Sequence, residues 1–341
     1  MSKFKFPKKV LIIAEAGVNH NGNIDLAFKL IKTAKKCGAD IVKFQLFKAD
    51  KLIIKKANKP KYISDNKKLN KKTQFQILKE LELSIEQMKK LSNYCKKVNI
   101  EFMLSPFDID CILDIQKLNL KKIKIPSGEI NNLPYLREVA KQKKDVIMST
   151  GMSTLEEVST SIKILEASGL SRKKITILHC TTDYPTKLKD VNLSAMNLMR
   201  EKLNVKVGYS DHTNGNDVAI AATALGACVI EKHFTTDKSL PGPDHKASLE
   251  PKEFLNMVQS IRNVSLIYGN NKKIPVMAEK NNIKLVRKSI VANTHIKKHE
   301  AFNHQNIAIK RPGTGISPLE WDKVIGKKAK KNYKPDEIIK R

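Results

Sequence analysis

The sequence predicts an α/β fold, a (β/α)8 TIM barrel followed by a small, mainly β domain. Eight short apolar runs alternate with longer segments of helical period over about the first 260 residues, which matches eight strand–helix units. Several of these runs are apolar at consecutive positions, as expected for parallel strands that are covered on both faces. A doubly wound open sheet is the alternative, but eight units of this length favour a closed barrel.

The expected strands are VLIIAEAG (10–17), DIVKFQ (40–45), IEFMLS (100–105), KKIKIPS (121–127), DVIMST (145–150), ITILHC (175–180), VKVGYS (205–210) and CVIEKHF (228–234). The expected helices are 24–37, 84–98, 109–118, 133–141, 154–168, 194–202 and 217–225, and 253–268 follows the last strand. Residues 46–80 interrupt this rhythm. They are polar and rich in lysine, and we expect a loop or a small hairpin over one mouth of the barrel.

The character of the sequence changes after residue 268. The segment GNNKKIPVMAEKNN is polar and rich in turn-forming residues. Short alternating runs and turns follow it, with no continuation of the strand–helix repeat. We therefore expect a barrel domain over 1–269, a linker over 270–283 and a second domain over 284–341.

Composition argues against two classes of partner. The formal net charge is +30, but nearly all of the basic residues are lysines scattered along the chain. Arginine is the usual choice for bidentate phosphate and base contacts, and no basic stripe with interleaved aromatics is present. No apolar run approaches the roughly 18 residues of a membrane helix. We expect a solvated, lysine-rich surface, with neither a nucleic acid nor a membrane as partner. A basic nucleic-acid-binding protein, suggested by the net charge alone, is the alternative.

The cysteines and the N-terminus indicate a cytoplasmic protein. The five cysteines form no CxxC pair and lie inside apolar segments, which is typical of buried, reduced thiols. The basic N-terminus precedes a run that contains Glu15 and lacks a cleavage site, so no signal peptide is expected.

Polar and reactive residues end nearly every expected strand. In a closed barrel these positions meet at one mouth, where the βα loops build the active site. The residues concerned are Glu15, Lys43, Gln45, Ser105, Lys124, Ser127, Glu129, Ser149, Thr150, His179, Thr182, Tyr184, Ser210, Asp211, His212 and His233.

Two of these endings are histidines on neighbouring strands. VGYSDHTNG (207–215) contains His212, and CVIEKHF (228–234) contains His233. Two imidazoles at adjacent strand ends, with carboxylates nearby, suit an open site for a divalent metal. The alternative is that either histidine is a hydrogen-bonded core residue.

Two lysines lie inside expected strands, where an ammonium group is costly unless it pairs with an anion. Lys43 and Lys124, with neighbouring serine and threonine hydroxyls, suit a phosphate or carboxylate group. A structural ion pair with Glu15 or Glu129 is one alternative. A Schiff-base lysine, as in an aldolase on the same barrel, is another.

The motifs together closely resemble the sialic acid synthase family, which includes the legionaminic and pseudaminic acid synthases. The matching segments are AEAGVNHNG (14–22), KFQ (43–45), SPF (105–107), KIPSGEINNLPYL (124–136), STGM (149–152), HCTTDYP (179–185), GYSDH (208–212), LGACVIEKHFT (225–235), PGPDHKASLEP (241–251) and KRPGTG (310–315). The resemblance implies a nonulosonate synthase, which condenses phosphoenolpyruvate with an N-acylated mannosamine-type sugar to a nine-carbon 2-keto acid. It also implies that residues 284–341 form an antifreeze-like (SAF) domain, swapped across a homodimer.

The resemblance assigns roles to individual residues. His212 and His233 match ligands of a divalent metal, usually manganese, with magnesium or cobalt as alternatives. Arg311 matches an arginine that the partner subunit contributes to the N-acyl group, and Thr182 stands where sialic acid synthases often have asparagine. Glu129 matches a carboxylate near the reacting carbons, and Glu15 and Asp244 are the further catalytic carboxylates expected. The phosphoenolpyruvate contacts implied are Lys43, Ser105, Lys124, Ser127, Ser149 and Ser210, and the sugar-side residues are Glu15, Gln45, Tyr184 and Asp244.

The resemblance leaves two sugars open as substrate. KFQ, PSGEINNLPYL and PGPDHKASLEP look closest to the legionaminic branch and to the sialic acid synthases that carry KFQ. The expected sugar is therefore N-acetylmannosamine or 2,4-diacetamido-2,4,6-trideoxymannose, which give N-acetylneuraminate or N,N'-diacetyllegionaminate. The pseudaminic acid precursor ranks lowest, because those synthases differ around the first strand and the PGPD segment.

Overall fold

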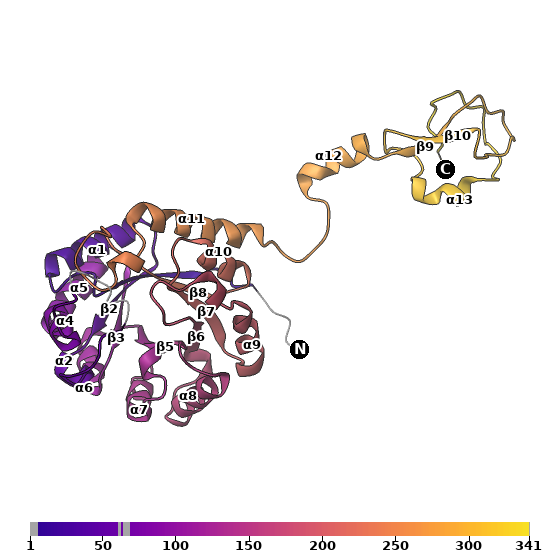
Figure 1. Ribbon diagram of the computed structural model, residues 1–341. Helices are drawn as coiled ribbons and strands as arrows, with labels where there is room; N and C mark the ends of the chain where they lie inside the picture. Colours follow the sequence, from indigo (N-terminus) through magenta and orange to yellow (C-terminus); the bar gives the residue numbers. More distant parts are fainter. Residues whose placement is uncertain (1–5, 61–62, 64–68, 341) are drawn as a thin grey trace. The chain divides into compact units, whose positions relative to one another are not determined.

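The structure, a computed structural model, describes residues 6–60, 63 and 69–340. Within these residues a set of parallel strands closes into a barrel in the order β1 to β8, with helices around its outside (Figure 1). The predicted (β/α)8 barrel is confirmed. Its strands are β1 (Leu11–Gly17), β2 (Ile41–Leu46), β3 (Glu101–Pro106), β4 (Lys122–Ile125), β5 (Asp145–Ser149), β6 (Ile175–His179), β7 (Lys206–Asp211) and β8 (Val229–His233).

Several helices of the barrel unit begin at residues whose side chains cap them. Thr154 and Glu157 form a reciprocal capping box at the start of α8, and Ser84 and Gln87 form one at the start of α5. The helices are α1 (Ile24–Lys36), α2 (Ala49–Leu52), α4 (Gln74–Leu81), α5 (Ile85–Lys97), α6 (Ile109–Ile115), α7 (Leu133–Lys141), α8 (Leu155–Ala167), α9 (Ser194–Leu203), α10 (Asp217–Ala224) and α11 (Pro251–Ile267).

The excursion after β2 differs from its prediction. We expected residues 46–80 to form a loop or small hairpin, but their described part contains α2 and α4; residues 61, 62 and 64–68 lie outside the description. Leu69, Ile77 and Leu81 pack with Val18 and Phe47 in a small apolar cluster. The apolar positions spaced four apart on α4 were the missed helical signal.

The barrel interior is divided into an apolar layer and a polar layer. Side chains alternate between the two faces of each strand. Ile13, Ile41, Met103, Ile147, Leu178 and Val229 therefore form a buried cluster inside the barrel. Two residues further along β1 and β8, the inward positions carry Glu15 and Glu231 instead of Ile13 and Val229. This layering leaves the polar residues at the carboxyl ends of the strands, where the βα loops begin.

The chain divides into two compact units, the first ending at Gly269 and the second beginning at Asn270. The second contains α12 (Met277–Val286), the antiparallel strands β9 (Ser289–Ala292) and β10 (Ile307–Lys310), and α13 (Trp321–Val324). It has its own buried core, which includes Ile290, Phe302 and Tyr333. The segment expected as a turn-rich linker, 270–283, contains the first turns of α12.

No helix in the described ranges combines the length and the apolar character that a bilayer crossing requires.

Gly22 gives a test of the loop between β1 and α1. Its φ is +73°, and a Cβ at this position would lie 2.2 Å from the backbone oxygen of Glu80 in α4. We expect Gly22→Ala to lower the free energy of unfolding by about 3 kcal/mol, from left-handed strain plus overpacking. Gly169 has a φ of +93°, and a Cβ there would meet no atom within 4 Å, so Gly169→Ala is the matched control and should cost about 1 kcal/mol. Urea unfolding measures the free energy of unfolding of both variants. Equal decreases for Gly22→Ala and Gly169→Ala would contradict a close contact between Gly22 and α4.

Candidate functional site

A cavity of about 320 Å³ lies at the carboxyl ends of the barrel strands, and we call it the mouth cavity. It brings together all but two of the residues to which the family resemblance assigns a role. Those that line it are Glu15, Lys43, Gln45, Ser105, Lys124, Ser127, Ser149, Thr182, Tyr184, Ser210, His212, His233 and Asp244.

Glu129 and Arg311 are the two of these predicted site residues that do not line the mouth cavity. Glu129 lies in a 3-10 turn after β4 and accepts a hydrogen bond from Asn132 Nδ2 at 2.7 Å. It lines a neighbouring pocket together with Asp108 and Asp110, and Phe107 lines both this pocket and the mouth cavity. Burial raises the pKa of the Glu129 carboxyl group. Arg311 is an exposed residue of the second unit.

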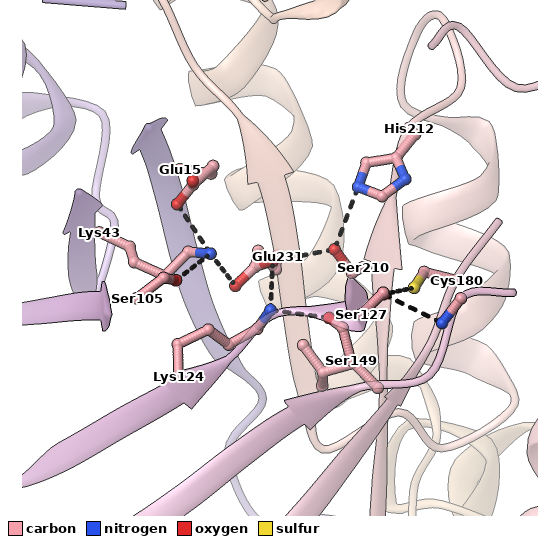
Figure 2. A network of polar contacts seen from close by, with 12 residues as sticks. Glu15, Lys43, Ser105, Lys124, Ser127, Ser149, Cys180, Ser210, His212 and Glu231 are labelled. Atoms are coloured by element: carbon pink, nitrogen blue, oxygen red, sulfur yellow. Dashed lines mark hydrogen bonds and ion pairs between the residues drawn. The ribbon is translucent and has the colours of Figure 1, made fainter. Parts of the chain in front are cut away.

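A network of buried ion pairs occupies the floor of the mouth cavity (Figure 2). Lys43 Nζ lies 3.0 Å from Glu15 Oε2 and 3.2 Å from Glu231 Oε2. Lys124 Nζ lies 3.3 Å from the other oxygen of Glu231. The carboxylate of Glu231 thus bridges the two lysines. Glu231 is therefore central to the site, although the sequence analysis did not select it.

Serine hydroxyls complete this network. Ser105 Oγ accepts from Lys43 Nζ at 3.2 Å, and Ser149 Oγ accepts from Lys124 Nζ at 2.7 Å. Ser210 Oγ donates to Glu231 Oε1 at 2.9 Å. Both lysines and Glu231 therefore contact an opposite charge and a hydroxyl, which offsets part of their cost of burial.

Strand register explains why these side chains meet. Glu15 pairs with Lys43 of β2 on one side and with His233 of β8 on the other. Ser210 of β7 pairs with Glu231 of β8. The signal for Glu231 was present in the sequence, because a glutamate within the apolar run CVIEKHF lies two residues before His233 and so on the same face.

Burial and charge set the protonation of the network. Burial alone would lower the pKa of Lys43, but the carboxylates of Glu15 and Glu231 outweigh it and raise this pKa. Burial would raise the pKa of Glu231, but Lys124 and Lys43 lower it. Burial raises the pKa of Glu15 to about 7 and that of Asp244 to about 6. The cavity therefore holds a firmly charged pair beside two acids that titrate near neutral pH.

The predicted histidine pair is present at the same mouth. The rings of His212 and His233 have centroids 5.7 Å apart, and the ring of Tyr184 lies 4.3 Å from that of His212. His212 Nδ1 donates to the carbonyl oxygen of Thr181 at 2.6 Å, which leaves a lone pair on Nε2. His233 Nδ1 is buried without a hydrogen-bond partner among the described residues and lies 3.8 Å from Asp244 Oδ2.

The two imidazoles fit the requirements of a divalent metal. Burial lowers the pKa of both, that of His212 to about 4, and neutral imidazole is the ligating form. Within the described part of the chain, no group of three or more histidine, cysteine or carboxylate side chains converges as a metal site. The remaining coordination positions would therefore fall to water or substrate, as in open catalytic sites.

A second group of hydroxyls lies beside Gly151, in the loop after β5. Ser127 Oγ accepts from Gly151 N at 3.0 Å, and Thr182 Oγ1 is buried without a hydrogen-bond partner among the described residues. A Cβ on Gly151 would lie 2.1 Å from Thr182 Oγ1, so only glycine permits this close approach. An unsatisfied buried hydroxyl that lines a cavity is suited to binding a polar ligand.

Comparison with known proteins identifies the family. The NeuB family model matches residues 30–273, and the SAF domain model matches residues 287–341. The chain belongs to the NeuB family. It is 49% identical to the N,N'-diacetyllegionaminic acid synthase of Campylobacter jejuni, over 98% of this chain and 99% of that one. It is 45% identical to the synthase of the same name from Legionella pneumophila, over 94% and 90%.

A solved structure agrees with the family assignment. The sialic acid synthetase of Leptospira borgpetersenii, in complex with citrate, aligns with a TM-score of 0.71 at 30% identity, over 83% of this chain and 94% of that one. The sequence-based predictions of the family, of a nonulosonate synthase and of a C-terminal SAF domain are confirmed.

Replacing the bridging carboxylate tests the ion network. Glu231→Gln removes the anion that two buried lysines share, and we expect the free energy of unfolding to fall by about 3 kcal/mol or more. Glu101→Gln is the control, because its pair with Lys122 is partly exposed at the other end of neighbouring strands and should cost less than about 1 kcal/mol. Urea unfolding of both variants checks this. Equal free energies of unfolding for the Glu231→Gln and Glu101→Gln variants would contradict the network.

Proposed function

We propose that the protein condenses phosphoenolpyruvate with 2,4-diacetamido-2,4,6-trideoxymannose to give N,N'-diacetyllegionaminate and phosphate. N-acetylmannosamine is the second candidate sugar. The observation that carries the proposal is the mouth cavity, where a lysine and serine cradle lies beside two neutral histidines. The identity of 45–49% to two N,N'-diacetyllegionaminic acid synthases over nearly their full length supports the choice of sugar.

The lysine and serine side of the cavity suits phosphoenolpyruvate. Lys43 and Lys124 provide positive charge, and the hydroxyls of Ser105, Ser149 and Ser210 lie within the same network. Ser127 and Thr182 add hydroxyls on the Gly151 side. An arriving anion competes with Glu231 for the lysines. Because the pKa of Glu15 is already about 7, this carboxyl group can take up a proton and leave Lys43 available to the ligand.

The apolar part of the cavity lining favours a sugar that carries methyl groups. Ile77, Leu78 and Leu81 of α4 form it, together with Phe107. These apolar side chains suit the methyls of acetamido groups and of a 6-deoxy carbon better than they suit hydroxyl groups. Gln45, Tyr184 and Asp244 are the polar residues that we assign to the sugar.

His212 and His233 would hold a divalent cation, manganese first, with magnesium or cobalt as alternatives. Bound there, the cation would act as a Lewis acid toward the sugar aldehyde. In the reaction, C3 of phosphoenolpyruvate bonds to the aldehyde carbon, water adds at C2, and the C2–O bond to phosphate breaks.

Two carboxyl groups of the cavity can assist this chemistry. Glu15, with a pKa of about 7, is suited to give a proton to the developing alkoxide of the sugar. Glu231, held as a carboxylate by the lysines, is suited to stabilise positive charge that develops at C2. Glu129 does not line the mouth cavity, and its catalytic role near the reacting carbons stays a prediction.

The Schiff-base alternative fits the geometry less well. A lysine nucleophile must be neutral, and two carboxylates raise the pKa of Lys43. Lys124 has a pKa lowered by burial, but its nitrogen already donates a hydrogen bond to Ser149 and forms an ion pair with Glu231.

The swapped homodimer and the cytoplasmic location stay predictions.

Mass spectrometry with labelled phosphoenolpyruvate tests the proposed function. Incubation with each candidate sugar and Mn²⁺ should give N,N'-diacetyllegionaminate from the diacetamido sugar, with a kcat/KM at least tenfold above that for N-acetylmannosamine. ¹⁸O in the bridging position of phosphoenolpyruvate should appear in the released phosphate, and chelation by EDTA should stop turnover until Mn²⁺ is restored. Label retained in the keto acid, or turnover that EDTA does not affect, would overturn the proposal.

Arg311→Ala tests the proposed sugar contact from a partner subunit. Loss of a charged hydrogen bond to the N-acyl group should raise the KM for the sugar about tenfold or more, with the KM for phosphoenolpyruvate within twofold of its original value. Lys310→Ala, next to it and paired with Asp336, is the control and should change neither constant. Equal increases in both constants for Arg311→Ala would contradict this role.

A further inference from the structure

A second buried ion pair lies directly behind the histidines. Asp211 precedes His212 on β7, Lys232 precedes His233 on β8, and the two residues are register partners. Lys232 Nζ lies 2.8 Å from Asp211 Oδ2, and both side chains are fully buried. Because side chains alternate along a strand, this pair points away from the barrel interior. Neither residue lines the mouth cavity, so neither can touch a substrate there.

The pair also forms hydrogen bonds with Thr213, the residue that follows His212. Lys232 Nζ donates to the carbonyl oxygen of Thr213 at 2.6 Å. Asp211 Oδ1 accepts from the backbone nitrogen and the hydroxyl of Thr213, at 2.9 and 2.7 Å. The residues before and after His212 are therefore both held by the side chain that immediately precedes His233.

Stability alone does not account for this arrangement. Apolar residues of similar volume commonly replace a buried ion pair with no loss, or with a gain, in stability. An apolar pair would also maintain the register of two strands. It would not bind the Thr213 carbonyl, and so it would leave the turn after β7 free to shift the backbone of His212 relative to that of His233.

We propose that Lys232 and Asp211 are positioning residues that fix the separation and orientation of the two imidazoles, and through them the affinity for a divalent cation. The inference rests on the proposed function, in which these histidines hold the metal. The pair acts from outside the barrel, through the backbone on each side of His212, without contacting the cation.

The double variant Lys232→Met/Asp211→Asn tests the proposal. It removes both charges together, so no unpaired charge is buried, and the amide that replaces the Asp211 carboxylate keeps an oxygen for Thr213. We expect a folded protein whose dissociation constant for Mn²⁺ alone, by isothermal titration calorimetry, is at least tenfold higher than that of the original chain. The affinity for phosphoenolpyruvate without metal should stay within twofold.

A matched control separates positioning from simple stabilisation. Arg262 of α11 pairs at 2.6 Å with Asp40, which directly precedes β2. This pair lies away from the histidines. Arg262→Met/Asp40→Asn should lower the melting temperature and leave the Mn²⁺ dissociation constant unchanged. A purely structural role for Lys232 and Asp211 would give this same pattern in their double variant.

The outcomes distinguish this inference from the proposed function. If the original chain fails to bind Mn²⁺, the metal assignment itself is wrong. If it binds Mn²⁺ and the Lys232→Met/Asp211→Asn variant binds within twofold, the positioning role is overturned. Should the double variant not fold, Asp211→Asn alone serves as the second variant. At least threefold weaker Mn²⁺ binding supports the proposal, and unchanged binding overturns it.

Discussion

The bridge that Glu231 forms between Lys43 and Lys124 is the interaction on which the site depends. Two ammonium groups inside a closed barrel repel each other and lose hydration, so they require an anion that reaches both. Glu231 meets this need with one oxygen toward each lysine, and Ser210 orients it from the neighbouring strand. The network keeps positive charge available within a small cavity, where an incoming phosphate or carboxylate exchanges one anionic partner for another.

The barrel places the two halves of the chemistry at fixed positions. The inward side chains of β1, β2, β4 and β8 provide the charged floor, while the strand ends of β7 and β8 provide the histidines. The apolar layer of Ile13, Met103 and Leu178 lies inside the barrel below this floor. Outward residues of the same strands face the helices. The ion pair of Asp211 and Lys232 lies on this outward face, and in our proposal it positions the histidines of the inward face. In this proposal β7 and β8 serve binding on their inward face and positioning on their outward face.

The sequence alone was sufficient for the barrel and for most of the cavity, because strand ends in a closed parallel sheet converge whatever the details of the loops. It was insufficient where regular alternation ends. Glu129 follows β4 by four residues and lies in a 3-10 turn, so its direction does not follow from the strand. Residues 46–80 were misjudged because their lysines obscured the apolar positions of α4. Glu231 was overlooked although it lies on the same face of β8 as His233, two residues before it. Arg311 belongs to the other unit, and no pattern within the barrel bears on its role.

A crystal structure of the protein with phosphoenolpyruvate and Mn²⁺ tests the central claim most directly. We expect an oxygen of the ligand within hydrogen-bond distance of both Lys43 Nζ and Lys124 Nζ, Glu231 still contacting at least one of them, and the cation bound to His212 and His233 in the same cavity. Phosphoenolpyruvate bound away from both lysines, or a cation held by neither histidine, would contradict it.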